Sequence, residues 1–220
     1  YADSAPWPRG ADGQGRTMEL LDPQGDLSDP SSWFDGCLGG SPGTVYSPCD
    51  DPVVFSEINY YSRPGFDMGD WVEIRNISDT VVDLSSWTFM DGVDSIGHRF
   101  VIPEGINLQP LQNVVLVQDT ARFKWAMPDV ANVLGPFGFG LKNTGEWIRA
   151  YDCNGKIILS VRYDDQSPWP SQANGEGYTL ELDAEQGLMN DGNNWFAGCY
   201  GGSPGTAYTP TCPPVGSADL

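Results

Sequence analysis

The stretch from residue 70 to residue 89, DWVEIRNISDTVVDLSSWTF, decides the fold of this chain. Within residues 71–75, valine and isoleucine alternate with tryptophan, glutamate and arginine, which is the period of two of a half-buried strand. We predict a strand with one face in the core and one face in water. Further on, Leu84, Trp87 and Phe89 lie around a Ser-Ser turn, so a second strand can fold back and bury a large indole beside the first. The stretch therefore predicts a core hairpin.

Composition agrees with a β protein. The chain has 220 residues, of which 40% are hydrophobic and 12% aromatic, and this content excludes a disordered chain. It also has 27 Gly and 18 Pro, and no apolar helical period lasts more than a few turns. Many short strands joined by turns are expected. An all-β sandwich is the default prediction.

The order of residues in the deciding stretch resembles a known family. An acidic residue is followed by Trp-Val-Glu-Ile, an Asn, Val-Asp-Leu-Ser-x-Trp-Thr-Phe and Asp-Gly, all within 70–92. This pattern is similar to the lamin-tail domain, an immunoglobulin-like β-sandwich found in nuclear lamins and in many secreted bacterial proteins. The resemblance extends from Val53 to Gly205, and the closing phrase of the chain is similar to that of bacterial members. It implies an immunoglobulin-like β-sandwich of lamin-tail type and says little about function.

The first fifty residues recur near the end of the chain. With an offset of 162, residues 1–48 match residues 163–210 without a gap and are identical at 26 of 48 positions. A repeat of this kind has to be settled before the fold is argued. We predict a partial lamin-tail copy at 1–50 that holds only closing strands, a complete domain at 51–212, and a tail at 213–220. The start at Tyr1, without Met or a signal-peptide pattern, suggests that an upstream part was removed or left out.

Further strands are predicted between the two copies. An Asn154-Gly155 pair between alternating segments is the strongest short signal for a hairpin. Pro128 is expected to end a single helical turn. The predicted strands are 53–60, 98–102, 113–118, 147–152, 156–163 and 178–182, and the helical turn is 121–127.

Charge and hydropathy restrict the partners. The chain carries 30 acidic and 11 basic side chains, a formal net charge of −19, so a phosphate backbone would be repelled. Nucleic acid is therefore not expected as a partner. The acidity indicates either a well-solvated surface or cation binding. No run of 18 apolar residues is present, so no membrane span is predicted.

The cysteine spacing is repeated. Cys37 and Cys49 are separated by a Gly-Gly-Ser-Pro-Gly turn, and Cys199 and Cys212 by the same turn and one more residue. This repetition predicts two local disulfides, with four reduced thiols as the alternative. Cys153 is the odd cysteine and is either an exposed thiol or half of an intermolecular bridge. The disulfides favour a secreted, periplasmic or cell-surface protein.

Catalytic residues are sparse. His98 is the single histidine, and no Gly-x-Ser-x-Gly elbow accompanies it. Glu57 and Glu73 could be imagined as a glycosidase pair, but both fall at strand positions that the resemblance explains as sandwich structure. We therefore expect no enzyme activity. No cofactor is expected either.

Oxygen-rich turns offer weak calcium candidates, because carboxylates in such turns are the ligands that Ca²⁺ prefers. Asx and Gly residues are also ordinary turn formers, and this reading is favoured. None of the turns fits an EF-hand loop. The candidates are Asp91, Asp94, Asp164, Asp165 and Asp191.

Aromatic turns are the remaining candidate sites. Trp7 and Trp169 each lie in a stiff Pro-Trp-Pro turn, and Trp147 lies in a predicted strand, so these rings could stack on sugar or peptide. Core roles are favoured for all three.

The sequence as a whole predicts a non-catalytic extracellular or cell-surface module that mediates protein–protein contacts or assembly. An accessory carbohydrate- or ligand-binding domain of a secreted hydrolase is the alternative. Residues 1–49 have too few strands to cover their aromatic side chains. We therefore expect them to pair with strands from elsewhere, either in the same chain or in another copy or a larger complex.

Overall fold

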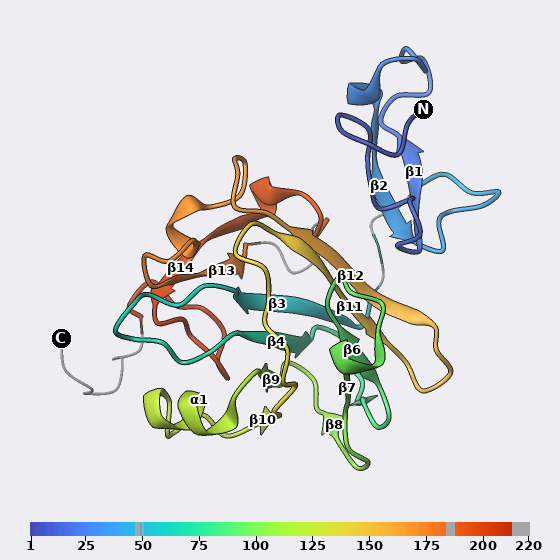
Figure 1. The fold of residues 1–220 in the computed structure, drawn as a ribbon. Coiled ribbons are helices and arrows are strands. Elements are labelled where there is room, and N and C mark those ends of the chain that lie inside the picture. The colour runs from blue at the N-terminus through green and yellow to red at the C-terminus, as the bar shows by residue number, and fades with distance from the viewer. Residues whose placement is uncertain (47–48, 50, 184–187, 213–220) are drawn as a thin grey trace.

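The computed structural model describes residues 1–46, 49, 51–183 and 188–212. Its main body is a sandwich of two β-sheets, and a separate two-stranded hairpin lies at the N-terminal end (Figure 1). One sheet has the strand order β10-β9-β4-β3-β13-β14 and the other the order β12-β11-β6-β7. The six-stranded sheet contains β3 (Val53–Asn59), β4 (Trp71–Asn76), β9 (Asn113–Val117), β10 (Val133–Leu134), β13 (Tyr178–Leu182) and β14 (Trp195–Tyr200). The four-stranded sheet contains β6 (Thr88–Met90), β7 (Arg99–Val101), β11 (Glu146–Tyr151) and β12 (Ile157–Tyr163).

The remaining elements are short. The small β5 (Val82–Asp83) and β8 (Asn107–Leu108) pair with each other, and β1 (Arg16–Leu20) pairs with β2 (Trp33–Leu38). The α-helix α1 (Thr120–Ala126) is capped by Asp119, whose carboxylate accepts from two helix amides. The 3₁₀ turns are η1 (Pro30–Ser32), η2 (Ile96–His98), η3 (Ser171–Ala173) and η4 (Gly192–Asn194).

The core lies between the two sheets. Phe55 of β3 meets Phe89 of β6 edge to face, with ring centroids 6.2 Å apart. Val72 and Ile74 of β4 are fully buried on the same side, as their alternation predicts. Trp87 is 6% exposed, so the predicted burial of the indole is confirmed. An immunoglobulin-like sandwich is therefore the architecture of the main body.

The predicted hairpin in residues 70–89 is wrong in its pairing. β4 pairs with β3 and β9, whereas β6 pairs with β11 and β7 in the opposite sheet. Between them the chain crosses the core through a turn in which the Trp87 amide donates to the Leu84 carbonyl. The two halves of the stretch therefore face each other across the sandwich. The apolar pattern is the same in both arrangements, so the sequence did not distinguish them.

The second face of β4 is not in water, contrary to the prediction. Trp71 is fully buried against Phe123 of α1, with ring centroids 5.9 Å apart. Glu73 is 2% exposed, beneath the loop that contains Gly202. A side chain at Gly202 would put a Cβ 2.8 Å from the Trp71 ring, so this position needs glycine. The helix and the loop together cover a second, smaller core.

Several other predictions are confirmed. β11 and β12 form the hairpin expected around Asn154-Gly155, and β9 is buried on both faces. Both disulfides are present, Cys37–Cys49 and Cys199–Cys212. The proposed tail at 213–220 lies outside the described residues.

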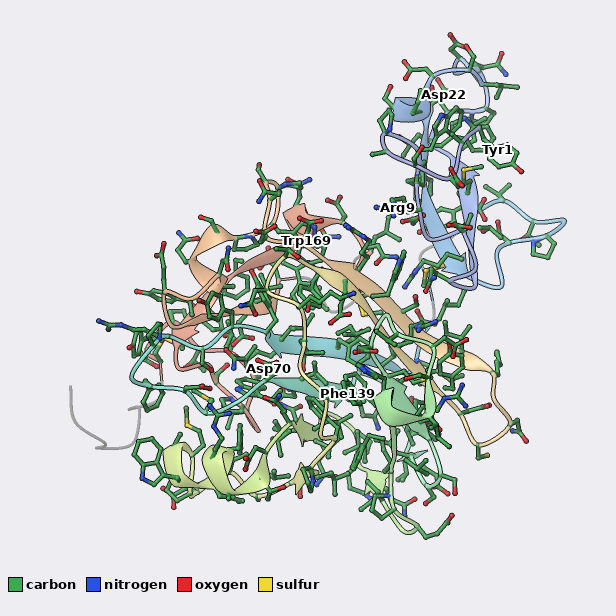
Figure 2. The ribbon with its side chains drawn as sticks, viewed as in Figure 1. Tyr1, Arg9, Asp22, Asp70, Phe139 and Trp169 are labelled. Atoms are coloured by element: carbon green, nitrogen blue, oxygen red, sulfur yellow. A yellow bond between two sulfur atoms is a disulfide. The ribbon has the colours of Figure 1, made fainter. Side chains whose placement is uncertain are left out.

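The two copies of the repeat have different surroundings. β13 joins the large sheet beside β3, whereas β1 and β2 form a sheet of their own. Arg16 of β1 is 5% exposed and donates to the Ser160 carbonyl of β12 at 3.0 Å. Figure 2 shows Trp169 in the main body, and Tyr1 and Asp22 in the separate hairpin. The N-terminal copy thus contacts the main body without adding a strand to its sheets.

Candidate functional site

The most unusual chemical feature is a group of three buried glutamates in the six-stranded sheet. Glu57 of β3, Glu73 of β4 and Glu181 of β13 are 0%, 2% and 4% exposed. They come from three adjacent strands, and Glu57 stands opposite both others in the strand register. We call these three side chains the glutamate cluster.

A glycine-rich loop at residues 201–205 closes over the glutamate cluster. The Ser203 amide donates to Glu57 at 3.0 Å, and the Gly205 amide donates to Glu73 at 2.6 Å. The Ser203 hydroxyl also donates to Glu181. Because these bonds join strands far apart in the sequence, the loop and the glutamate cluster fasten the closing hairpin to the sheet.

Side chains of the sheet supply further donors. Glu73 accepts from Ser56 at 2.7 Å and from Asn113 at 2.9 Å, and Glu57 accepts from Thr179 at 2.6 Å. These bonds stabilise the carboxylates, but burial has the larger effect. Removal from water raises the pKa of all three glutamates, and the neighbouring carboxylates raise that of Glu57 further. The glutamate cluster therefore holds protons near neutral pH.

An open groove of about 500 Å³ lies beside the glutamate cluster. Carboxylates, one arginine and two aromatic rings line it, and Phe196 meets Tyr208 edge to face at 4.7 Å. The lining thus combines polar and aromatic side chains. Its lining includes Glu73, Arg75, Glu181, Phe196 and Tyr208.

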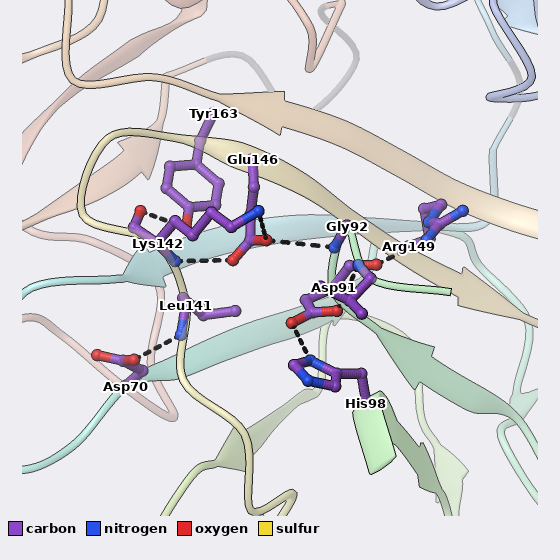
Figure 3. Close-up of polar contacts among 10 residues, drawn as sticks. Asp70, Asp91, Gly92, His98, Leu141, Lys142, Glu146, Arg149 and Tyr163 are labelled. Carbon is purple, nitrogen blue, oxygen red and sulfur yellow. Dashed lines mark hydrogen bonds and ion pairs between the residues drawn. The ribbon is translucent and has the colours of Figure 1, made fainter. Parts of the chain in front are cut away.

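A second polar network surrounds the single histidine (Figure 3). The Nδ1 atom of His98 lies 2.5 Å from a carboxylate oxygen of Asp91, which is 1% exposed. Arg149 donates to the Asp91 carbonyl at 2.7 Å. The imidazole stacks on Phe139, with ring centroids 5.4 Å apart. This pair resembles the base and orienter of a catalytic triad, but in the described residues no serine hydroxyl or cysteine thiol bonds to the His98 imidazole.

The same network continues along β11. Glu146 accepts from the Lys142 amide at 2.7 Å, and Tyr163 donates to the Lys142 carbonyl at 2.8 Å. Burial raises the pKa of Glu146. Asp70 accepts from the Leu141 amide at 2.7 Å, and burial raises its pKa to about 7. These groups hold loop 138–146 against the sandwich, so they stabilise the fold.

The calcium candidates are spread over the molecule. In the described part of the chain, no group of three or more His, Cys, Asp or Glu side chains is placed to hold a metal ion. The candidate carboxylates instead bond to groups near them in sequence. The partners are Val93 and His98 for Asp91, Arg99 for Asp94, Arg162 and Gln166 for Asp164, Asn174 for Asp165, and Asn193 for Asp191.

The candidate aromatic residues are mostly internal. Trp169 is 8% exposed and packs on Trp195, with ring centroids 5.7 Å apart, so its indole is part of the core rather than an exposed surface. Its turn faces the core because Trp195 and β13 lie beneath it. Trp7 is half-buried against Trp33 at 6.5 Å, and Trp147 is half-buried in β11. Cys153 is an exposed free thiol in the β11–β12 turn.

Sequence reasoning considered Glu57 and Glu73 but missed Glu181 and the loop that closes over them. A signal was present, since Thr-x-Glu and Gly-Gly-Ser-Pro-Gly occur together in both copies of the repeat. A glutamate at the same strand position in both copies, next to a loop rich in free amides, indicates a buried carboxylate site.

Sheet order, core and polar networks together define an extended immunoglobulin-like sandwich with structural carboxylate sites. Comparison with known proteins gives the family: the Lamin Tail Domain model matches residues 48–165. The chain therefore belongs to the lamin tail domain family, whose members are structural immunoglobulin-like domains rather than enzymes. A search of curated proteins finds no match. No helix in the described residues is long and apolar enough to cross a membrane.

Proposed function

We propose that this chain is a non-catalytic structural module that works outside the cytoplasm and makes protein–protein contacts in an assembly. The observation that carries the proposal is the exposed apolar surface of the N-terminal copy. Leu21, Leu27 and Val45 are 63%, 60% and 91% exposed, all within a segment of 46 residues. Apolar side chains left in water on this hairpin favour a contact with another protein.

Hydrogen bonds within the fold already occupy the buried polar groups of both polar networks, which supports a non-catalytic role. Hydrogen bonds from its loop occupy the glutamate cluster, and the Asp91–His98 pair packs on Phe139. Asp91 and two of the three glutamates accept from backbone amides, and Glu181 accepts from the Ser203 hydroxyl. Catalysis needs acid and base groups that can reach a substrate, and these groups support the fold instead.

Two disulfides support a location in an oxidising compartment. Both close short loops next to the Gly-Gly-Ser-Pro-Gly turns, where they tie the exit of each repeat to a strand. Such bonds persist in secreted, periplasmic and cell-surface proteins and are reduced in the cytoplasm. The net charge of −19 favours partners with basic surfaces over nucleic acid.

The groove beside the glutamate cluster favours a second candidate function, an accessory carbohydrate- or ligand-binding domain of a secreted hydrolase. Tyr208 is 37% exposed at its rim and could stack on a sugar ring. Titration with oligosaccharides, followed by tryptophan fluorescence, tests this candidate. Saturable binding that Tyr208→Ala abolishes would establish it, and a flat titration removes it.

Sedimentation velocity over a range of concentrations tests the main proposal. We expect the intact chain to self-associate, and a Leu21→Asp, Leu27→Asp, Val45→Asp variant to remain monomeric. A matched variant, Ile96→Asp with Val101→Asp, changes apolar side chains that are 90% and 58% exposed on the main body and should associate like the parent. A parent chain that is monomeric throughout, or turnover of esters or glycosides that His98→Ala abolishes, contradicts the proposal.

A further inference from the structure

The two copies of the closing hairpin differ at one edge. β13 pairs with β14 on one side and with β3 on the other, where Glu181 stands opposite Glu57. β1 pairs with β2 in the equivalent register, with an irregularity at the equivalent place. Within the described residues, no strand pairs with the other edge of β1. An open edge of this kind can accept another strand.

The polar groups that receive β3 and β4 in the C-terminal copy are present in the N-terminal copy. Thr17 and Ser41, the counterparts of Thr179 and Ser203, both donate to Glu19 at 2.9 Å. In the C-terminal copy the amides of Ser203 and Gly205 hold Glu57 and Glu73. In the part of the chain that the structure describes, the equivalent amides of Ser41 and Gly43 donate to no carboxylate.

The apolar side of the hairpin shows the same difference. Met18 and Trp33 are half-buried, whereas their counterparts Leu180 and Trp195 are 0% and 4% exposed. A cavity of about 460 Å³ lies beside Met18. The N-terminal hairpin therefore has an open edge, free amides and uncovered apolar surface in the places where its copy contacts β3 and β4.

We propose that the open edge of β1 is a docking site for a two-stranded segment of the β3–β4 type from another lamin-tail polypeptide. The segment pairs its first strand with β1 and presents two glutamates to the amides of Ser41 and Gly43. This inference rests on the proposed function and names the partner and the surface. The chain's own β3 is already occupied by β13, so it does not fill the site.

The recognition has three physical parts. Main-chain hydrogen bonds along the strand give affinity that does not depend on sequence, as in other cases of strand addition. Two carboxyl groups whose oxygens accept from the backbone amides of Ser41 and Gly43 fix the register. Apolar residues of the incoming strands cover Met18 and Trp33. A docked strand without the glutamates would bury the amides of Ser41 and Gly43 without acceptors, which weakens the complex.

Hydrogen exchange with a peptide probe tests the inference. The probe is a peptide of residues 52–77, which contains β3 and β4, fused to a soluble carrier and added to the intact chain. We expect exchange in residues 16–20 to slow by at least about tenfold at saturation, while residues 178–182 are unchanged. A probe carrying Glu57→Leu and Glu73→Leu should bind at least about tenfold more weakly.

Matched variants of the chain locate the site. Thr17→Val removes a hydroxyl at the proposed site and should weaken probe binding several-fold. Thr179→Val removes the equivalent hydroxyl where β3 is already bound, and should leave probe binding unchanged. Equal effects of the two variants, equal binding of the double-leucine probe, or no slowing in residues 16–20 overturns the inference.

Other occupants of the β1 edge should give different hydrogen-exchange results. The Arg16 amide already donates to the Gly10 carbonyl, so the informative amides are those of residues 17–20 that do not face β2. Protection of these amides without the probe, at any chain concentration, shows that the edge is filled within the molecule, and protection that rises with chain concentration shows a second copy there. Either result overturns the inference. Self-association without any change in residues 16–20 overturns it while the proposed function stands.

Discussion

The N-terminal hairpin and the C-terminal hairpin share 26 of 48 residues, yet only one is part of the sandwich. Both have the same strand register and the same Gly-Gly-Ser-Pro-Gly turn after the second strand. In both, a disulfide starts at the equivalent cysteine of that strand. They differ in burial: Trp195 is 4% exposed, and Trp33 is half-buried. The comparison shows that the hairpin is specified locally, whereas its burial and its carboxylate site depend on the strands next to it.

Replacement of a tryptophan by alanine should give the largest difference in unfolding free energy between the two copies. Trp195 packs on Trp169 and donates to the Met189 carbonyl at 2.8 Å, so Trp195→Ala should lower the free energy of unfolding by about 3–5 kcal/mol. Trp33→Ala should cost about 1 kcal/mol or less, because its ring is already partly in water. Denaturant unfolding followed by circular dichroism measures both. Equal losses would show that the two copies are equally packed.

Removal of the disulfides should give the next largest difference between the two copies. The bridged residues are 12 and 13 positions apart, so the chain-entropy model gives each bond about 3 kcal/mol. Cys199→Ser with Cys212→Ser should lower the midpoint of the main unfolding transition. Cys37→Ser with Cys49→Ser should speed hydrogen exchange in residues 16–20 and leave the main transition in place. A main transition that shifts equally in both variants contradicts this expectation.

The pH dependence of stability tests the glutamate cluster, which only the C-terminal copy completes. Burial raises the pKa of Glu73, Glu181 and Asp70 to about 7, so the folded chain binds more protons than the unfolded chain above their ordinary values near 4–4.5. Stability should therefore fall as the pH rises from about 5 to about 8, by about 2–3 kcal/mol for each of these groups.

Isosteric substitution provides the control for this pH effect. Glu181→Gln should make the stability profile less steep because the amide does not titrate, and Glu19→Gln, at the half-buried counterpart position in the N-terminal hairpin, is the matched control. Urea midpoints at a series of pH values measure both variants. A parent chain whose stability rises between about pH 5 and about pH 8 would show that the cluster is ionised in the folded state.

The smallest expected effect concerns the contact between the N-terminal hairpin and β12. Arg16 donates to the Ser160 carbonyl of β12 and to the Gly36 carbonyl at 2.9 Å. Arg16→Met should free the N-terminal hairpin from β12 and change the unfolding free energy of the main body by less than about 0.5 kcal/mol. Small-angle scattering should show a larger radius of gyration, and the urea midpoint should not move. An unchanged radius would mean that other contacts hold the hairpin.

The sequence determined the local features of this protein. Alternation placed β3, β4, β11 and β12, Asn154-Gly155 placed a hairpin, and the repeated spacing of cysteines placed both disulfides. These depend on side-chain period, turn chemistry and short loop closure, all of which act within about a dozen residues. The family resemblance then gave the class of sandwich.

Only the tertiary structure decided which sheet each strand joins and which faces are covered. Residues 70–89 have the same apolar pattern whether their halves pair in one sheet or face each other across the core. Glu73 belongs to a site because Gly205, which lies 132 positions away, reaches it with an amide. The Gly43 amide, which is the counterpart of the Gly205 amide in the repeat, has the same local sequence and donates to no carboxylate among the described residues. Local sequence cannot specify contacts of this kind, because they depend on the free energy of packing distant segments together.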